Sequence, residues 1–415
     1  MAGFFDILDV IPTKAPPSLV PRCGSCGLYQ HCSSPKMPVD GRGKRRILVI
    51  GEAPGRNEDK EGKPFVGKTG RYFRDEFLKV GIDLREDCWM TNSLICWPHD
   101  KDGKNRPPTD KEISYCRPNV IKVIQDLDPE IILLLGSKAV SSVLSWLWKD
   151  DLGSISRWEG WTIPCQKLNA WICPLWHPSY VVRGKDAQEE DGHFLQRQQA
   201  LREMLYRKRI AKVAELQGRP WKTVPHWDKG VDVILDPNIA ASKVREFNTS
   251  LVPVAIDFET DRLKPDRDEA AILTCALSDG KKTIAYPWVG EAIPASLEFL
   301  ASGVGKVASN MKFEQRVSLA RIGRRIKNWV WDTMVAAHVL DNRAEITSIK
   351  FQSFVLLGQE DYDSHVKPYM RSKGSNEPNR LKEANLGRVL VYNGLDSLLE
   401  SKVAQIQAKQ LGIEL

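Results

Sequence analysis

Two short apolar stretches, each ending at a glycine and followed by a helical pattern, constrain the fold of this chain most strongly. Residues 45–50 (RRILVI) run into a loop rich in glycine and proline, and residues 67–80 then carry apolar side chains at helical spacing. Residues 130–135 (EIILLL) run into Gly136, and residues 137–148 again have a helical pattern. Short strands that alternate with helices predict an α/β fold with a mostly parallel sheet.

A break in this pattern indicates a second unit. A basic, helical stretch covers residues 194–216, and residues 222–230 then lack any apolar periodicity. New strands are expected at 231–235 and 252–258, with a helix from Pro237 between them. A chain of 415 residues is also long for one domain. We therefore expect two α/β domains, residues 1–225 and residues 226–415.

The net charge indicates what kind of partner the protein has, and the use of cysteine indicates the cellular compartment. The formal net charge of +7 favours a polyanionic partner such as DNA, although local basic clusters can equally be solvated faces. No apolar run is long enough for a membrane span, and the first residues lack the pattern of a secretion leader. Nine cysteines, of which only Cys275 lies beyond residue 173, suit reduced thiols in a cytoplasm, some of them holding a metal.

The glycine-rich loop after the first strand is the first candidate ligand site. Residues 51–55 (GEAPG) follow the strand and residues 62–67 (GKPFVG) precede the helix, so the backbone can approach a ligand closely at the sheet edge. Pattern alone would allow any phosphate or nucleotide loop. The complete string GEAPGRNEDKEGKPFVGKTG, however, resembles the first motif of the iron–sulfur uracil-DNA glycosylases known as family four.

Further motifs extend this resemblance over roughly residues 20–190. Thr91-Asn92 matches the TN motif of that family, and His177-Pro178-Ser179-Tyr180 with Arg183 matches its HPSYLLR-like motif. The resemblance implies that the protein takes uracil out of DNA and holds it in a tight pocket. Ser179 and Arg183 are then expected to contact the substrate.

The resemblance also implies roles for individual pocket residues. Phe65 would stack on the uracil ring, Asn92 would select against cytosine through its amide, and His177 would stabilise the charge on the departing base. Glu52 would orient the base or a water. Ala53 stands where other uracil glycosylases carry a water-activating aspartate, a residue that family four also lacks. The alternatives are core packing for Phe65, a turn for Asn92 and a structural histidine for His177.

Four cysteines are expected to bind a metal cofactor. Cys23 and Cys26 form a CxxC motif, while Cys96 and Cys116 flank a loop rich in proline and lysine. In family four, cysteines so placed hold a 4Fe–4S cluster, and zinc bound by the same thiolates is the alternative. Cys32 is not usual in that family and could compete as a ligand.

The second unit contains acidic residues at spacings that suggest a divalent-metal site. Asp257 and Glu259 stand at i and i+2 on an expected strand and so share one face, while Phe258 points into the core. Tyr392 and Asp396 stand at i and i+4, which places them on one face of a helix. Clustered carboxylates repel one another unless cations neutralise them, as in two-metal sites that cleave phosphodiesters.

Residues 230–415 resemble the DEDDy 3′–5′ exonucleases, the proofreading domains of family A DNA polymerases, whose fold is ribonuclease-H-like. The resemblance implies that Asp257, Glu259 and Asp396 bind Mg²⁺ or Mn²⁺ and that Tyr392 positions the attacking water. The second sequence motif of these exonucleases corresponds to residues 310–314. Asn310 is expected to contact the substrate. Glu314 stands where these exonucleases usually have an aspartate. If Glu314 is not a ligand, Asp332 is the alternative.

This order of domains resembles the N-terminal part of DNA polymerases of some large bacteriophages. No polymerase domain fits in the 19 residues after Asp396, so we expect a separate polymerase or a longer parent protein in a bacterial or phage-infected cell. Three hypotheses follow: a bifunctional uracil glycosylase and exonuclease, a proofreading subunit whose glycosylase-like domain only binds DNA or senses uracil, and a scaffold in which neither site turns over.

Overall fold

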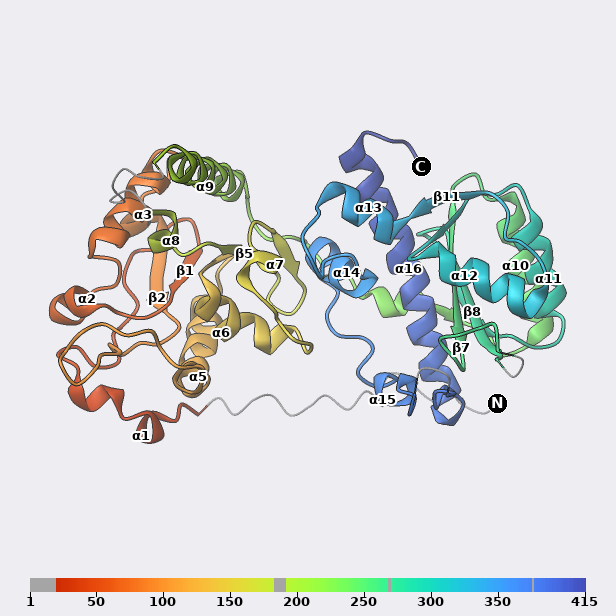
Figure 1. Cartoon of the computed structure of the whole chain (residues 1–415), viewed down its shortest axis with the longest axis horizontal. Coiled ribbons are helices and arrows are strands. Elements are labelled where there is room, and N and C mark those ends of the chain that lie inside the picture. Colours follow the sequence, from red (N-terminus) through yellow and green to blue (C-terminus); the bar gives the residue numbers. More distant parts are fainter. Residues whose placement is uncertain (1–19, 183–191, 268–269, 375–376) are drawn as a thin grey trace. The chain divides into compact units, whose positions relative to one another are not determined.

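The computed structural model describes residues 20–182, 192–267, 270–374 and 377–415, without the side chains of 192–196. The chain divides into two compact units between Val224 and Pro225 (Figure 1). Both units combine a sheet with flanking helices, as the predicted α/β class requires.

The N-terminal unit is built on a five-stranded sheet in the order β2-β1-β3-β5-β4. The first four strands in this order are parallel, and β4 pairs with β5 in the antiparallel direction. The predicted mostly parallel sheet is therefore confirmed. The strands are β1 (Ile47–Gly51), β2 (Cys88–Asn92), β3 (Ile131–Leu135), β4 (Ile163–Cys165) and β5 (Ala170–Leu175).

Helices cover this sheet, and the loops that join strands to helices lie at its carboxyl edge. Every residue of β1 and β3 is buried, because helices pack on both faces of the sheet. The helical elements are α1 (Cys23–Cys26), η2 (Leu28–His31), α2 (Arg56–Glu61), α3 (Lys68–Leu78), α4 (Leu84–Asp87), α5 (Asp110–Leu127), α6 (Ser137–Leu147), α7 (Ile155–Trp158), α8 (Pro178–Val182) and α9 (Gly192–Ala214). Among the described residues, no helix is both long and apolar enough to cross a bilayer.

The C-terminal unit contains a six-stranded mixed sheet in the order β11-β10-β7-β8-β9-β6. The strand β7 lies in the interior of this sheet, antiparallel to β8 and parallel to β10. The strands are β6 (Asp232–Val233), β7 (Val254–Thr260), β8 (Ile272–Ser278), β9 (Thr283–Pro287), β10 (Lys306–Ala308) and β11 (Trp329–Asp332).

One long helix, α16 (Leu386–Leu411), packs against β7, β8 and β9 and supplies much of the buried surface of this unit (Figure 1). Its first turn is capped by the Asn385 side chain, which accepts the Arg388 N–H. The other helical elements are η3 (Trp227–Gly230), α10 (Pro237–Glu246), η4 (Phe247–Thr249), α11 (Ala292–Ala301), α12 (Met311–Val317), η5 (Ser318–Ile322), α13 (Thr333–Leu340), α14 (Ile349–Leu357), α15 (Lys367–Met370) and η6 (Leu381–Glu383).

Candidate active sites

A cavity of about 330 Å³ opens at the carboxyl edge of the N-terminal sheet. The glycine-rich loop, the end of β2 and the start of α8 supply its walls. Phe65, Asn92 and His177, which the sequence places far apart, all line it. Ala53 also lines the cavity, whereas the half-buried Glu52 is not among its lining residues in the described part of the chain. Arg183 lies outside the described residues.

Gly51 makes room for two of these side chains. It ends β1 and pairs with Asn92 in the register of β1 and β2. A β-carbon added to Gly51 would lie 2.3 Å from Oδ1 of Asn92 and 2.9 Å from Cζ of Phe65. Both side chains therefore approach the same backbone atom, which only glycine permits.

Phe65 is held in an unusual backbone conformation. Its φ of +59° lies in the left-handed region, where a bulky residue is strained. The Arg74 guanidinium donates to the Phe65 carbonyl over 3.1 Å, and the Phe73 ring packs 5.8 Å from the Phe65 ring. Residues in the second turn of α3 thus fix Phe65 at the cavity wall.

Two residues that the sequence analysis did not single out connect the loops of this site. The Glu58 carboxylate accepts the N–H groups of Gly55 and Gly67, each over 3.0 Å, and so joins the two halves of the glycine-rich loop. Asn105 Oδ1 accepts the Arg56 N–H over 3.1 Å and the Trp97 indole N–H over 2.7 Å. Asn105 therefore connects this loop with the segment between Cys96 and Cys116.

The contacts of His177 determine which ring nitrogen carries the proton. The Ser179 backbone N–H donates to Nδ1 of His177 over 3.3 Å, and the Ser179 hydroxyl lies 2.8 Å from the same atom. A backbone N–H can only donate, so Nδ1 is the acceptor and the proton of the neutral ring is on Nε2. The ring is then a hydrogen-bond donor on its other side.

Cys23, Cys26, Cys96 and Cys116 together line a second cavity. The sulfur of Cys96 accepts the Lys36 N–H over 3.3 Å, and that of Cys116 accepts the Asn119 amide over 3.4 Å, as thiolate ligands would. Burial raises the pKa of Cys116 to about 11, so the thiolate form needs a bound cation.

The distances between the cysteine sulfurs can be compared with those expected around a single zinc ion. Four thiolates around one zinc ion lie about 4 Å from one another, given zinc–sulfur bonds of about 2.3 Å. Among the described residues, no three cysteine sulfurs lie within 4.8 Å of one another. Both a single zinc ion and a polynuclear iron–sulfur cluster are bound by sets of four thiolates. Cys32 does not line the cavity, and its thiol donates to the Leu28 carbonyl over 3.2 Å.

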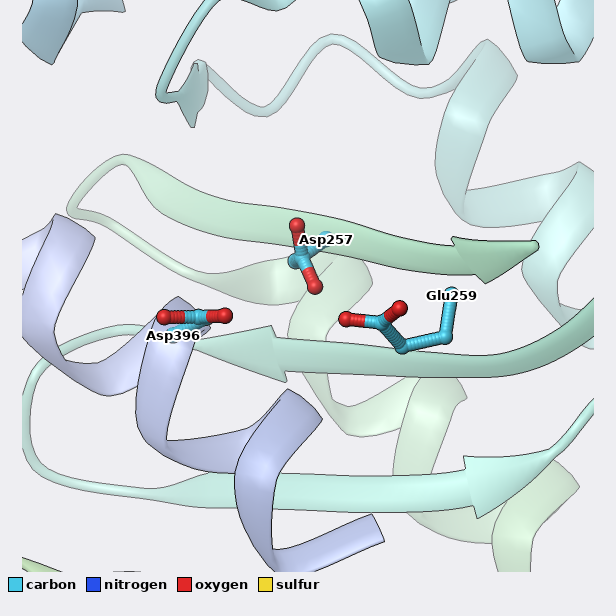
Figure 2. Close-up of side chains that lie close together, drawn as sticks. All are labelled: Asp257, Glu259 and Asp396. Atoms are coloured by element: carbon cyan, nitrogen blue, oxygen red, sulfur yellow. The ribbon is translucent and has the colours of Figure 1, made fainter. Parts of the chain in front are cut away.

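In the C-terminal unit, Asp257, Glu259 and Asp396 converge. Each offers one carboxylate oxygen, and these three atoms lie within 4.8 Å of one another. Figure 2 shows the two residues of β7 and Asp396 of α16 pointing toward a common position. Three carboxylate oxygens at this spacing could hold a hard divalent cation such as Mg²⁺ or Mn²⁺.

Electrostatics supports a cation at this position. Burial, and then the charge of Asp396, raise the pKa of Asp257 to about 8. Burial, and then Asp257, also raise the pKa of Glu259 well above its usual value. Three carboxylates this close together, of which Glu259 and Asp396 are buried and Asp257 is half-buried, cannot all be ionised near neutral pH unless a positive charge joins them.

The candidate residues outside this triad occupy other positions. Glu314 is buried in α12 and lies outside the triad, with one oxygen that has no hydrogen-bond partner among the described residues. Asp332, the fallback ligand, accepts the N–H groups of Asn310 and Met311 over 3.0 Å each and also caps α13. The carboxylate of Asp332 therefore stabilises the backbone, including Asn310 with its φ of +64°.

Tyr392 and two unpredicted residues surround Asp396 and Asp257. Tyr392 is buried, and the Tyr362 ring stacks on it with centroids 5.9 Å apart. The Tyr362 hydroxyl donates to Asp396. Asn393, adjacent to Tyr392 in the sequence, donates to Oδ2 of Asp257 over 2.6 Å. Asn393 could have been found because it lies inside the motif, whereas Tyr362 belongs to a segment without a recognisable pattern.

Comparison with known proteins assigns the N-terminal unit. A family profile described as "Uracil DNA glycosylase superfamily" matches residues 38–214. The type-4 uracil-DNA glycosylase of Archaeoglobus fulgidus is 30% identical over 173 residues, which are 40% of this chain and 82% of that enzyme. A DNA polymerase of Bacillus phage SP01 is 29% identical over 154 residues, which are 37% of this chain and 15% of the polymerase.

Among solved structures, that of Escherichia coli RNase D, an exoribonuclease, is weakly similar to this chain. It has 16% sequence identity and a TM-score of 0.34, and the match covers 44% of this chain and 46% of that one. A likeness of this size does not assign a fold or a reaction to the C-terminal unit, whose chemistry is therefore inferred from its own side chains.

Proposed function

This chain belongs to the uracil-DNA glycosylase superfamily through its N-terminal unit, and we propose that it is a bifunctional DNA-processing enzyme. The N-terminal unit excises uracil, and the C-terminal unit removes nucleotides from 3′ ends in a metal-dependent reaction. The observation that carries the combined proposal is the presence, in one chain, of the Phe65, Asn92 and His177 cavity and the Asp257, Glu259 and Asp396 triad.

In the proposed excision reaction the cavity holds an extruded uracil. Phe65, fixed by α3, stacks on the ring, and the Asn92 amide hydrogen-bonds the edge that distinguishes uracil from cytosine. The Nε2–H of His177 donates to the uracil oxygen on which negative charge develops as the glycosidic bond breaks. Ala53 supplies no carboxylate, so stabilisation of the departing base carries most of the rate acceleration.

In the proposed exonuclease reaction, Asp257, Glu259 and Asp396 would hold divalent cations, which would supply Lewis-acid activation of the phosphodiester and of the attacking water. Tyr392, beside Asp396 on α16, orients the water. Glu314 completes the site from α12, where burial and then Asp257 raise its pKa well above the usual value.

The four cysteines of the second cavity are proposed to hold a 4Fe–4S cluster with a structural role. Asn105 connects the segment that follows Cys96 with the base-binding loop through Arg56 and Trp97. Loss of the cluster would therefore disturb the uracil cavity, although the cluster itself takes no part in the chemistry.

We further propose that the protein works with a DNA polymerase, either separate or fused. The match to a phage polymerase supports this, as does the pairing of a repair activity with a 3′-end activity. A second candidate function, uracil sensing without excision, is favoured because Glu52, which was expected to orient the base or a water, is not among the cavity-lining residues in the described part of the chain. Free uracil released from a uracil-containing oligonucleotide in EDTA distinguishes the two: release supports excision, and tight binding without release supports sensing.

A further inference from the structure

Lys350 is a cation within the carboxylate site that the proposed reaction has not used. It lies on α14, and its ammonium group bonds Oδ2 of Asp363 over 2.5 Å. The same group lies 5.2 Å from the centroid of the Tyr392 ring. Lys350 therefore stands next to the residue proposed to orient the attacking water.

The neighbours of Lys350 hold it in this position. Asp363 is buried, and the adjacent Tyr362 stacks on Tyr392 and donates to Asp396. Two consecutive residues of one loop thus fix both the lysine and a candidate metal ligand. The Lys350 side chain itself is 29% exposed, so solvent and substrate can reach it.

The charge of Lys350 acts on the whole triad. Lys350 is a positive charge that acts on each of Asp257, Glu259 and Asp396, and it partly offsets their negative charge. Divalent cations bound to the triad would take over this neutralising role. Lys350 would then be free to pair with a different anion at the same place.

Asp363 does not prevent such a change of partner. The Lys367 ammonium lies 4.0 Å from the same Asp363 oxygen. If Lys350 turns toward a new anion, Asp363 stays paired with a cation and does not become an isolated buried charge, which would be costly.

We propose that Lys350 binds a non-bridging oxygen of the 3′-terminal phosphodiester and so forms a phosphate-binding position beside Tyr392. This inference rests on the proposed exonuclease function. The ligand is the anionic phosphodiester of a single-stranded 3′ end. A charge-assisted hydrogen bond of this kind contributes about 1.5–3 kcal/mol, which corresponds to roughly ten- to hundredfold in affinity.

The test measures binding of a fluorescent single-stranded oligonucleotide to the full chain, with Ca²⁺ in place of Mg²⁺ to limit cleavage. Lys350→Met is expected to bind on the order of tenfold more weakly. For single strands, log K falls with log salt, and each lost phosphate contact makes this negative slope less steep by about 0.7; the same change is expected here. Lys350→Arg should restore part of the affinity.

Two controls separate phosphate binding from a structural role. Lys402 is a half-buried lysine over the Trp227 ring, at 4.8 Å, and Lys402→Met should bind as the unaltered protein does. Asp363→Asn removes the partner of Lys350 but keeps the ammonium group, so the salt slope should not change. Mn²⁺ binding, followed by electron paramagnetic resonance, should survive in Lys350→Met.

Three results would overturn the inference: unchanged affinity and slope in Lys350→Met, the same loss in Asp363→Asn, or loss of Mn²⁺ binding in Lys350→Met. The last would mean that the lysine supports the carboxylates and not the phosphate. If the unaltered protein fails to shorten 3′ ends with Mg²⁺ or Mn²⁺, the proposed exonuclease function itself is wrong.

Discussion

The side-chain amide of Asn393 donates to the backbone carbonyl of Asp257 over 3.2 Å and to its Oδ2 over 2.6 Å. Its own oxygen accepts the Thr274 hydroxyl over 2.9 Å, so the amide cannot turn round without losing bonds. One residue of α16 thereby orients a carboxylate of β7. Substitution of groups that orient metal ligands in this way typically weakens metal binding by about ten- to hundredfold.

Asn393→Asp is predicted to weaken Mn²⁺ binding by about ten- to hundredfold, because it replaces a donor with an acceptor beside Asp257. An electron paramagnetic resonance titration measures this affinity directly. Asn328→Asp is the matched control, since the Asn328 amide bonds the Gly303 carbonyl outside the site. Mn²⁺ binding at the unaltered level in Asn393→Asp would show that the triad does not need this contact.

Gly51→Ala is predicted to reduce uracil release by on the order of a hundredfold, as loss of a transition-state donor would. The added methyl group would overlap Asn92 and Phe65, at 2.3 Å and 2.9 Å, and displace both. Single-turnover release of uracil measures the effect. Gly24→Ala should be tolerated, because a β-carbon there meets nothing within 4 Å. Normal release by Gly51→Ala would mean that uracil binds elsewhere.

The purified protein is predicted to be brown, with iron and sulfide bound by the four cavity cysteines. Cys96→Ser should lose this absorbance and unfold at a lower temperature, because cluster binding also stabilises the fold. Cys32→Ser should keep the colour, since the Cys32 thiol already donates to a backbone carbonyl. Visible absorbance and metal analysis under anaerobic conditions test this. Colourless protein with stoichiometric zinc would contradict it.

The pKa values of the triad predict how stability depends on pH when no metal is bound. Burial and Asp396 raise the pKa of Asp257 to about 8, so the folded state holds a proton that the unfolded chain releases near pH 4. This contribution to stability is fully present below pH 4 and is lost as the pH rises through 8. In EDTA, the melting temperature of the C-terminal unit should therefore fall across this range.

Added Mg²⁺ should reverse that trend, because the cation binds the ionised carboxylates. The gain in melting temperature on adding Mg²⁺ should be larger at pH 8 than at pH 5.5. Asp257→Asn should remove most of the pH dependence and most of the gain. An equal gain at both pH values would contradict the assignment of a raised pKa to the triad.

The sequence predicted the strand-and-glycine framework well, because a fully apolar run such as Ile131–Leu135 is stable only when buried between helices. It was less accurate at sheet edges. The strand expected at 231–235 is reduced to Asp232–Val233, which pairs with β9 at the edge of the sheet. The edge strand β4 was not predicted at all, since three residues carry too little periodicity.

The same contrast holds for the sites. Strand periodicity predicted that Asp257 and Glu259 share one face, the resemblance to DEDDy exonucleases implied that Asp396 joins them, and the structure brings the three together. Tyr362 and Lys350 could not be predicted, because their places depend on how α14 and the segment after it pack against α16. For Glu314, the sequence motif predicted the position of the residue along the chain but not its distance from the triad.

The most direct test of the two-site account uses one 5′-labelled, single-stranded oligonucleotide with an internal uracil and three forms of the protein. In EDTA followed by alkali, the unaltered protein should produce one break at the uracil, and with Mg²⁺ it should produce a ladder of products shortened from the 3′ end. Asp257→Ala should still produce the break at the uracil but no ladder. Asn92→Ala should still produce the ladder, while cleavage at the uracil should decrease by about a hundredfold. A ladder that survives in Asp257→Ala, or an oligonucleotide that keeps its uracil with the unaltered protein, would contradict the account.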